Sequence, residues 1–183
     1  VFDEATRAVT LEHVAAPRAP EVVYGLSVED IRAKHDALAE QATTVNAAGR
    51  VKRIRKDQNT LVAIVLSHPA TVEEVEADPE LAREVAEWEN RNVAWLQAEF
   101  GDQLEGVGRH TDEPYWHLHA YVIPRDPEMK AADLHPGFVA KAEARERLEA
   151  EGHDAKGVKK LSNAAYRDAM RQFQDRYWEM VGQ

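Results

Sequence analysis

Residues 110–119 read HTDEPYWHLH and place three histidines and two carboxylates within ten positions. Imidazole and carboxylate groups bind metal ions and transfer protons, so this segment has the side chains for chemistry. The chain contains no cysteine, and any metal would therefore be held by nitrogen and oxygen ligands. The residue types alone leave three interpretations open: a metal site, a nucleophilic histidine or a polar hairpin.

Two strands are predicted on either side of this motif, over residues 104–110 and 116–123. Because alternate side chains of a strand share a face, His117, His119 and Tyr121 point to one side of the second strand. The intervening residues are apolar and form the face that packs on the core. The histidine face is therefore available for function.

A hairpin between these strands would place His110 directly opposite His117, with their Cβ atoms about 4.5–5.5 Å apart. His119 follows on the same face, and the loop adds Asp112 and Glu113 beside the three imidazoles. Three nitrogen ligands with open coordination positions are typical of a catalytic metal site rather than a structural one. The spacing therefore favours a metal site, without selecting the metal.

Small and aromatic residues surround the predicted site. Gly106 and Gly108 lie on the histidine face of the first strand, where they leave room for a ligand or a neighbouring backbone to approach. Tyr115, Trp116 and Tyr121 supply rings on which nucleic-acid bases stack. The position of Trp116 in its strand favours packing in the core instead.

The composition predicts one globular domain spanning residues 1–183. The chain is 44% hydrophobic and has a formal net charge of −10, which argues against a surface broadly adapted to nucleic acid but permits a local basic groove. The segment RVKRIRK is either a solvated run of charges at the start of a strand or a phosphate-contacting edge, in which Arg53, Arg55 and Lys56 are predicted to contact phosphates. No apolar run is long enough to cross a bilayer and no signal peptide is visible, so we expect a cytoplasmic protein.

The remaining segments predict several helices and one further strand. Helices are expected from Ser27 to about Gly49, from Asp78 to Gly101, and over roughly 137–151 and 162–181, with a buried strand over roughly 59–67 ended by Pro69. This order predicts an α+β domain in which helices pack mainly on one face of a central antiparallel β-sheet.

The full motif also resembles that of a known family. The stretch HTDEPYWHLHAYVIP resembles the metal-binding motif of the MobV (Pre/Mob) plasmid mobilisation relaxases, within the HUH endonuclease superfamily. The positions that match in type and spacing are His110, Asp112, Glu113, His117, His119 and Pro124. Trp116 stands where the family usually has proline. The resemblance covers about residues 50–125, including the strand and the helix that lead into the motif.

The resemblance implies a divalent-metal-dependent relaxase of a bacterial mobile element. Such an enzyme nicks single-stranded or hairpin DNA at an origin of transfer and stays covalently attached to it. By this resemblance His110, His117 and His119 bind the metal, Glu113 is a fourth ligand or an orienting group, and Asp112 fixes an imidazole. Mn or Mg is the expected metal, with Zn, Ni or Co as alternatives. The domain would be the N-terminal part of a longer bacterial protein that forms dimers through a region beyond residue 183.

The motif does not supply the nucleophile. The family places it near the amino end in an H-N-x-R-like stretch, whereas this chain begins VFDEATRAVTLEH. His13 is the nearest N-terminal histidine, and Tyr166 is a candidate because other HUH enzymes carry a tyrosine on a helix after the motif. Tyr166 also forms a stripe at helical spacing with Met170, Phe173 and Tyr177, which is typical of core packing. The nucleophile therefore stays unassigned, inside or outside this chain.

Two other functions remain open. The stretch HLHAYVIPR also resembles the signature of the histidine-triad nucleotide hydrolases, but Tyr121 replaces their third histidine. A non-catalytic DNA-binding or regulatory domain with the relaxase fold would explain the missing N-terminal motif and the acidic composition. Hydrolysis of small nucleotides without added metal would indicate the first function. Metal-dependent DNA binding without strand cleavage would indicate the second.

Overall fold

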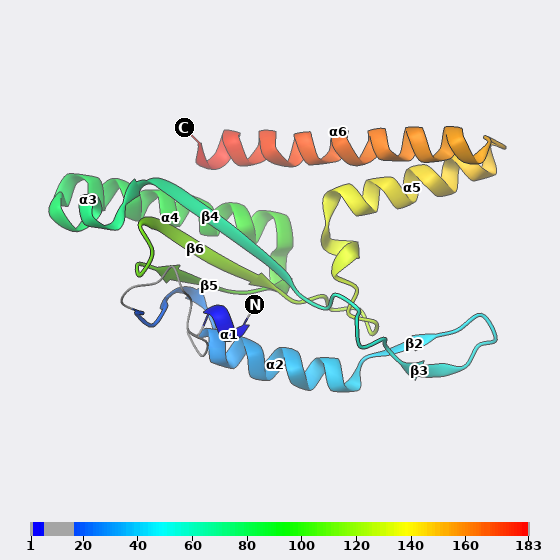
Figure 1. The fold of residues 1–183 in the computed structure, drawn as a ribbon, viewed down its shortest axis with the longest axis horizontal. Coiled ribbons are helices and arrows are strands. Elements are labelled where there is room, and N and C mark those ends of the chain that lie inside the picture. The colour runs from blue at the N-terminus through cyan, green and yellow to red at the C-terminus, as the bar shows by residue number, and fades with distance from the viewer. Residues whose placement is uncertain (1, 6–16, 183) are drawn as a thin grey trace.

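A four-stranded antiparallel sheet organises the chain, in the strand order β1–β5–β6–β4 (Figure 1). The computed structural model describes residues 2–5 and 17–182. In chain order the elements are α1 (Phe2–Ala5), β1 (Glu21–Gly25), α2 (Val28–Gln41), β2 (Thr43–Val45), β3 (Val51–Arg53), β4 (Val62–Thr71), α3 (Val72–Ala77), α4 (Pro79–Phe100), β5 (Leu104–His110), β6 (Tyr115–Val122), α5 (Pro136–Ala150) and α6 (Ala155–Val181). The predicted α+β class is confirmed. Within the described ranges, no helix combines the length and the apolar character needed to span a membrane.

Strands β5 and β6 form the predicted hairpin at the centre of the sheet. Their register pairs His110 with His117 and Gly108 with His119. Strand β4 pairs with the other edge of β6, so that Val65 lies opposite His119. The prediction that His110 and His117 face each other across the hairpin is therefore confirmed.

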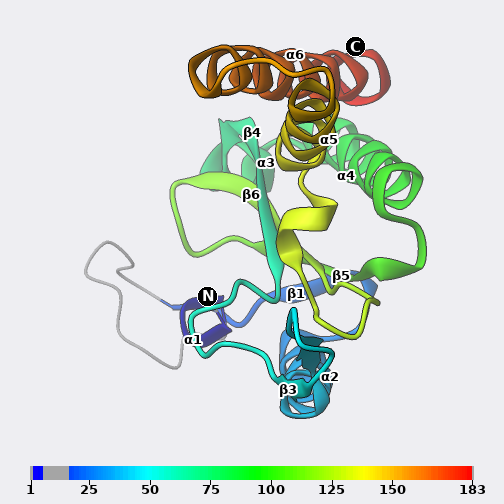
Figure 2. The ribbon, with the colours of Figure 1, turned by 90° about the vertical axis from the view of Figure 1, so that its right-hand side faces the viewer.

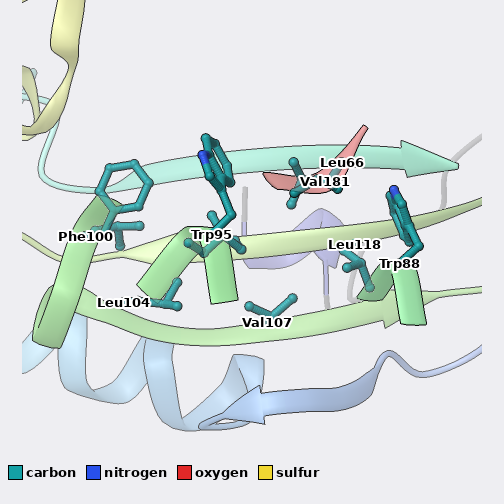
Figure 3. Packing of buried hydrophobic residues seen from close by; sticks show 11 residues of the cluster. Leu66, Trp88, Trp95, Phe100, Leu104, Val107, Leu118 and Val181 are labelled. Atoms are coloured by element: carbon teal, nitrogen blue, oxygen red, sulfur yellow. The ribbon is translucent and has the colours of Figure 1, made fainter. Parts of the chain in front are cut away.

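One face of the sheet packs on α4 and α6. Leu118 and Ala120 of β6 are fully buried on this face (Figure 3). Trp95 of α4 is also buried, and the centroid of its ring lies 5.0 Å from that of Phe173 and 4.9 Å from that of Tyr177, both on α6. The helix predicted from Asp78 to Gly101 is thus α4, and its buried apolar residues form its inner side.

The opposite face carries the histidines and is partly covered by α2. Figure 2 shows α2 on one side of the sheet and α4 and α6 on the other. Tyr121 of β6 and Ile31 of α2 are buried in the same cluster. The approach is close because Gly106 has no side chain: a Cβ atom there would lie 2.5 Å from the main-chain oxygen of Leu26 and 2.9 Å from Cδ1 of Ile31. Helices therefore lie on both faces, with α4 and α6 on the core face and α2 on the histidine face.

Side-chain caps fix the starts of the two helices that follow β4. Thr71 and Glu74 form a reciprocal capping box at the start of α3. The carboxylate of Asp78 accepts hydrogen bonds from the first turn of α4, and Pro79 occupies its first position, where the missing N–H costs nothing. Gly101 ends α4 with a positive φ of 56°. These are the boundaries that the sequence predicts for this helix.

The helix predicted to reach Gly49 ends at Gln41 instead. The chain then forms a short hairpin in which β2, residues 43–45, pairs with β3. The sequence of β2 is Thr-Thr-Val, and these β-branched residues favour a strand over a helix. In Figure 1 this hairpin extends away from the four-stranded sheet.

Two further boundaries differ from the predictions. Pro69 lies within β4 rather than at its end, because β4 is an edge strand and the pairing register with β6 is interrupted around this residue. Helix α6 begins at Ala155 rather than near residue 162. The Asp154 side chain accepts a hydrogen bond from the main-chain N–H of Gly157 and so caps the helix at this earlier point.

His68 of β4 is buried against Trp88 of α4, with ring centroids 5.2 Å apart. This burial lowers the pKa of His68 below its usual value, with a smaller opposing effect from the charge of Glu84. A lowered pKa means that the folded state resists protonation. The buried neutral imidazole therefore contributes fully to stability at pH values above the ordinary histidine pKa of about 6.5. This contribution is lost as the pH falls below that value.

Replacing Trp95 by alanine should lower the free energy of unfolding by about 3–5 kcal/mol, because it removes the ring on which α6 packs. Urea denaturation followed by circular dichroism measures this change. Trp178→Ala on α6 is the control, since its side chain is 66% exposed and its loss should cost less than about 0.5 kcal/mol. Equal stability of the two variants would show that α6 does not depend on Trp95.

Replacing His68 by glutamine should reduce the loss of stability between about pH 7.5 and about pH 5, because the buried imidazole no longer has to be protonated. Urea midpoints at the two pH values give this difference for each protein. His153→Gln is the control for the change from histidine to glutamine itself, because His153 is exposed after α5. A His68→Gln variant with the wild-type pH dependence would contradict the prediction.

Candidate functional site

Three imidazole rings lie together on the histidine face of β5 and β6. The ring centroid of His119 is 4.3 Å from that of His110 and 5.2 Å from that of His117, and the latter two are 5.4 Å apart. His110 is 1% exposed and His117 is 5% exposed, while His119 is half-buried. The convergence of three rings predicted from strand parity is confirmed.

The ring of His117 has a defined orientation. Its Nδ1 lies 2.9 Å from the main-chain oxygen of Tyr115, and because a carbonyl oxygen can only accept, Nδ1 carries the proton and donates it. The neutral ring then keeps a lone pair on Nε2, the atom that binds metal ions. A carboxylate oxygen of Glu113 lies 4.0 Å from this Nε2. The nitrogen that keeps its lone pair and a carboxylate thus lie on one side of the ring.

The donor types fit a divalent cation, but the site is not a finished coordination shell. Among residues 2–5 and 17–182, no three histidine, aspartate or glutamate side chains stand in the arrangement of a metal site. Three imidazoles and the carboxylate of Glu113 are nevertheless the ligand set that such a cation takes in a protein without cysteine. The rings would have to turn toward a shared point to coordinate it. Metal binding by His110, His117 and His119 therefore stays a prediction.

Asp112 connects the hairpin loop to the segment before β1. Its carboxylate accepts a hydrogen bond of 3.2 Å from the main-chain N–H of Arg18. The guanidinium of Arg18 in turn pairs with Glu76 of α3 at 2.9 Å. The loop between the two histidine strands is thus tied to the region that precedes the sheet. The role of Asp112 in fixing an imidazole stays a prediction.

A buried carboxylate holds the histidine strands from the reverse face. Glu89 of α4 is 3% exposed and accepts hydrogen bonds from Arg109 Nε at 2.7 Å and from Trp116 Nε1 at 2.8 Å. The guanidinium of Arg109 also lies over the Trp116 ring, 5.2 Å from its centroid. Hydrogen bonding to Glu89 raises the pKa of Arg109 above its ordinary value. Arg109 and Trp116 immediately precede His110 and His117, so this network sets the positions of both rings.

Sequence reasoning missed Glu89 because α4 is rich in glutamate and most of these side chains are exposed. The signal that identifies it is its position. Glu89 follows Val85 by four residues and precedes Asn92 by three, and both neighbours are buried. A carboxylate within the inner stripe of a helix requires a buried partner, and Arg109 is that partner.

Helix α1 covers the other end of the histidine face. The ring of Phe2 stacks on that of Tyr121 at a centroid distance of 5.9 Å, and it contacts His35 of α2 at 5.5 Å. Tyr121 is fully buried, and its ring centroid is 6.5 Å from that of His119. A continuous row of rings therefore runs from the histidines to α2.

Of the three aromatic residues predicted to stack on bases, Tyr115 is exposed and the other two are engaged in the protein. Tyr115 is 54% exposed at the start of β6. Trp116 binds Glu89 on the reverse face, as its strand parity predicted, and Tyr121 is covered by Phe2. The room predicted at Gly106 is filled by the backbone of Leu26 rather than by a ligand site.

The structure does not bring the predicted phosphate-binding residues to the histidines. All three are exposed on β3 or just after it: Arg53, Arg55 and Lys56. Arg55 pairs with its neighbour Asp57. The β2–β3 hairpin is anchored by a hydrogen bond from Thr43 to the carbonyl of Pro127, which follows the C-terminal end of β6. His117 lies near the N-terminal end of that strand and pairs with His110 of β5, so the basic hairpin lies toward the opposite end of the sheet (Figure 1).

The structure describes one of the two candidate nucleophiles, Tyr166. Tyr166 stacks on His135 at a centroid distance of 5.6 Å and contacts Phe138 at 5.5 Å, both at the start of α5. It belongs to α6, which packs on the face of the sheet opposite the histidines. The structure therefore does not join Tyr166 to the histidine site. His13 lies outside the described residues.

No protein-family model, curated protein or solved structure matches this chain. The functional argument therefore depends on the chemistry and geometry of its own residues. The resemblance to the relaxase motif stays a hypothesis.

Replacing Glu89 by alanine should lower the free energy of unfolding by about 3 kcal/mol, because it leaves a largely buried guanidinium without its main partner. It should also shift the imidazole NMR signals of His110 and His117, whose strands lose their anchor. Urea denaturation and histidine side-chain spectra measure the two effects.

Glu99→Ala is the matched control, because Glu99 lies on the same helix as Glu89 and forms a bidentate pair with Arg176 of α6, whose side chain is 45% exposed. Removing this pair should cost no more than about 1 kcal/mol and leave the imidazole signals in place. Unchanged imidazole signals in Glu89→Ala would contradict the positioning role of Glu89.

Proposed function

We propose that the chain is a divalent-metal-dependent nuclease domain that cuts single-stranded DNA by transesterification, in the manner of the plasmid mobilisation relaxases. The observation that carries the proposal is the grouping of His110, His117 and His119 on one face of a central antiparallel hairpin. The motif spacing and the antiparallel sheet with flanking helices support it. The substrate would be single-stranded or hairpin DNA at an origin of transfer.

The three imidazoles would hold the cation, with the Glu113 carboxylate beside them and Mn or Mg as the expected metal. A bound cation would polarise the scissile phosphate and offset the charge that develops on it. The protein would orient the side chains that hold the cation. The main-chain oxygen of Tyr115 fixes the ring of His117, and burial of His110 restricts the rotation of its ring. Both effects limit the orientations that are open to the two rings.

The nucleophile must reach the histidine face. Tyr166 is on a helix that packs against the other side of the sheet, so we assign it a packing role. This leaves His13 as the candidate within the chain, with a residue beyond it as the alternative. The attached residue in a covalent protein–DNA adduct should therefore not be Tyr166.

The histidine-triad alternative is disfavoured by the surroundings of Tyr121. This residue occupies the position of the third histidine, and its ring is fully buried under Phe2. A hydrolase of that class needs an accessible imidazole there. The relaxase proposal predicts strand cleavage that depends on added metal, whereas the hydrolase alternative predicts turnover in EDTA.

His117→Ala and His119→Ala should each weaken Mn(II) binding by at least about 100-fold, because changes in groups that merely support a ligand already cost 10–100-fold. Both should abolish conversion of circular single-stranded phage DNA to the linear form. Calorimetry with Mn(II) and denaturing gels measure the two effects, and circular dichroism checks the fold.

His153→Ala is the control, because this histidine is exposed near the α5–α6 connection and its loss should change neither readout. Wild-type protein that binds no Mn(II) and opens no DNA circle would refute the proposal. Metal-dependent DNA binding without cleavage would instead support the regulatory alternative.

A further inference from the structure

A cavity of about 440 Å³ opens on the histidine face of the sheet, beside Tyr121. Ala63 of β4 forms part of its wall and lies directly opposite Tyr121 in the sheet register. Tyr121 follows His119 by two residues, so cavity and histidines occupy adjacent rows of the same face. The side chains that matter for its chemistry are Phe2, Arg32, His35, Asn59, Thr60 and Ala63.

The row of rings described above connects the histidine cluster to this cavity. Successive centroid distances are 6.5 Å from His119 to Tyr121, 5.9 Å from Tyr121 to Phe2, and 5.5 Å from Phe2 to His35. The last two rings of the row, Phe2 and His35, line the cavity. Its wall therefore offers the flat, apolar surfaces on which a planar ligand packs.

The polar groups of the cavity are arranged to hydrogen-bond a neutral ligand. His35 Nδ1 lies 3.0 Å from the carboxylate of Asp36, and its Nε2 lies 2.9 Å from Thr60 Oγ1. The carboxylate accepts from Nδ1, so in the neutral ring Nε2 accepts from the Thr60 hydroxyl, whose oxygen keeps lone pairs for a ligand. The cation Arg32 is paired with Asp3. The guanidinium that lines the cavity is therefore already paired, and the cavity is not suited to bind a phosphate group.

The surface between the cavity and the histidines is open along β4. On the histidine face this strand presents Ala63, Val65 and Ser67, and all three are exposed. Val65 is 58% exposed although it is apolar and lies directly opposite His119. Small and apolar side chains on an exposed strip leave space for a chain that runs from one site to the other.

We propose that this cavity binds the nucleobase of a nucleotide whose phosphate lies at the histidine cluster; the nucleotide class rests on the function proposed above. Its volume falls within the range of about 300–1,000 Å³ typical of small-molecule sites. The rings pack against the base, while Thr60 and the amide of Asn59 address its edge. An unstacked base is what an enzyme that cuts a single strand must hold.

The test uses nitrogen-15-labelled full chain in EDTA, titrated separately with dAMP, dGMP, dCMP and TMP. At least one nucleotide should shift the amide signals of Asn59, Thr60 and Ala63, with a Kd on the order of 1 mM. Ala63→Trp should weaken this binding at least about tenfold, because the indole fills the cavity from an exposed strand position. Asn59→Ala should change the order of affinities among the four nucleotides, because an amide discriminates between base edges.

Val45→Trp is the matched control, since Val45 is also an exposed strand residue, 61% exposed on β2 and outside the cavity. It should bind nucleotides as the wild type does. The proposal is overturned if no nucleotide shifts these amides, or if Ala63→Trp binds as tightly as Val45→Trp. Because the titration contains neither metal nor cleavage, nucleotide binding without nicking would count against the nuclease function alone. Nicking without nucleotide binding would count against this site alone.

Discussion

The histidine site depends on the hydrogen bonds that the buried carboxylate of Glu89 accepts. A charged group with 3% exposure is stable in the core only when its hydrogen-bonding capacity is filled, and Arg109 and Trp116 fill it from two neighbouring strands. Each of these residues is adjacent to a histidine whose side chain points the other way. The ion pair therefore fixes the two strands at the point where His110 and His117 must meet.

Because side chains alternate along a strand, the two faces of the sheet carry residues with different roles. Residues of β6 with even numbers, such as Leu118, pack on α4, while His117 and His119 project to the other side. On the core face, burial of apolar side chains around Trp95 stabilises the fold. The residues of the histidine face are therefore not required for this part of the stability. Gly106 completes the arrangement, because its missing side chain lets α2 cover one end of this face and leave the other end to the histidines.

Much of this arrangement can be predicted from local sequence. The predicted hairpin gave the pairing of His110 with His117, and strand parity placed His119 on the same face, because alternate side chains of a strand share a face. The ends of α4 were predictable from Asp78 and Gly101, which act within their own helix. Properties that depend on distant partners were not. The pairing of Glu89 with Arg109 joins residues twenty positions apart, and no local pattern predicts it.

The position of the basic segment relative to the histidines likewise depends on distant parts of the chain. Arg53 and Arg55 precede β4 in the sequence, but the turn of the chain after Gln41 inserts a separate hairpin and places them at the far end of β6. The sheet separates the groups that lie on its two faces. Groups on α6 face its other side, whereas α1, α2 and the segment around Arg18 lie on the side of the histidines. Among the described elements, α1, α2, the segment around Arg18 and the hairpin loop are therefore the ones positioned on the histidine side of the sheet.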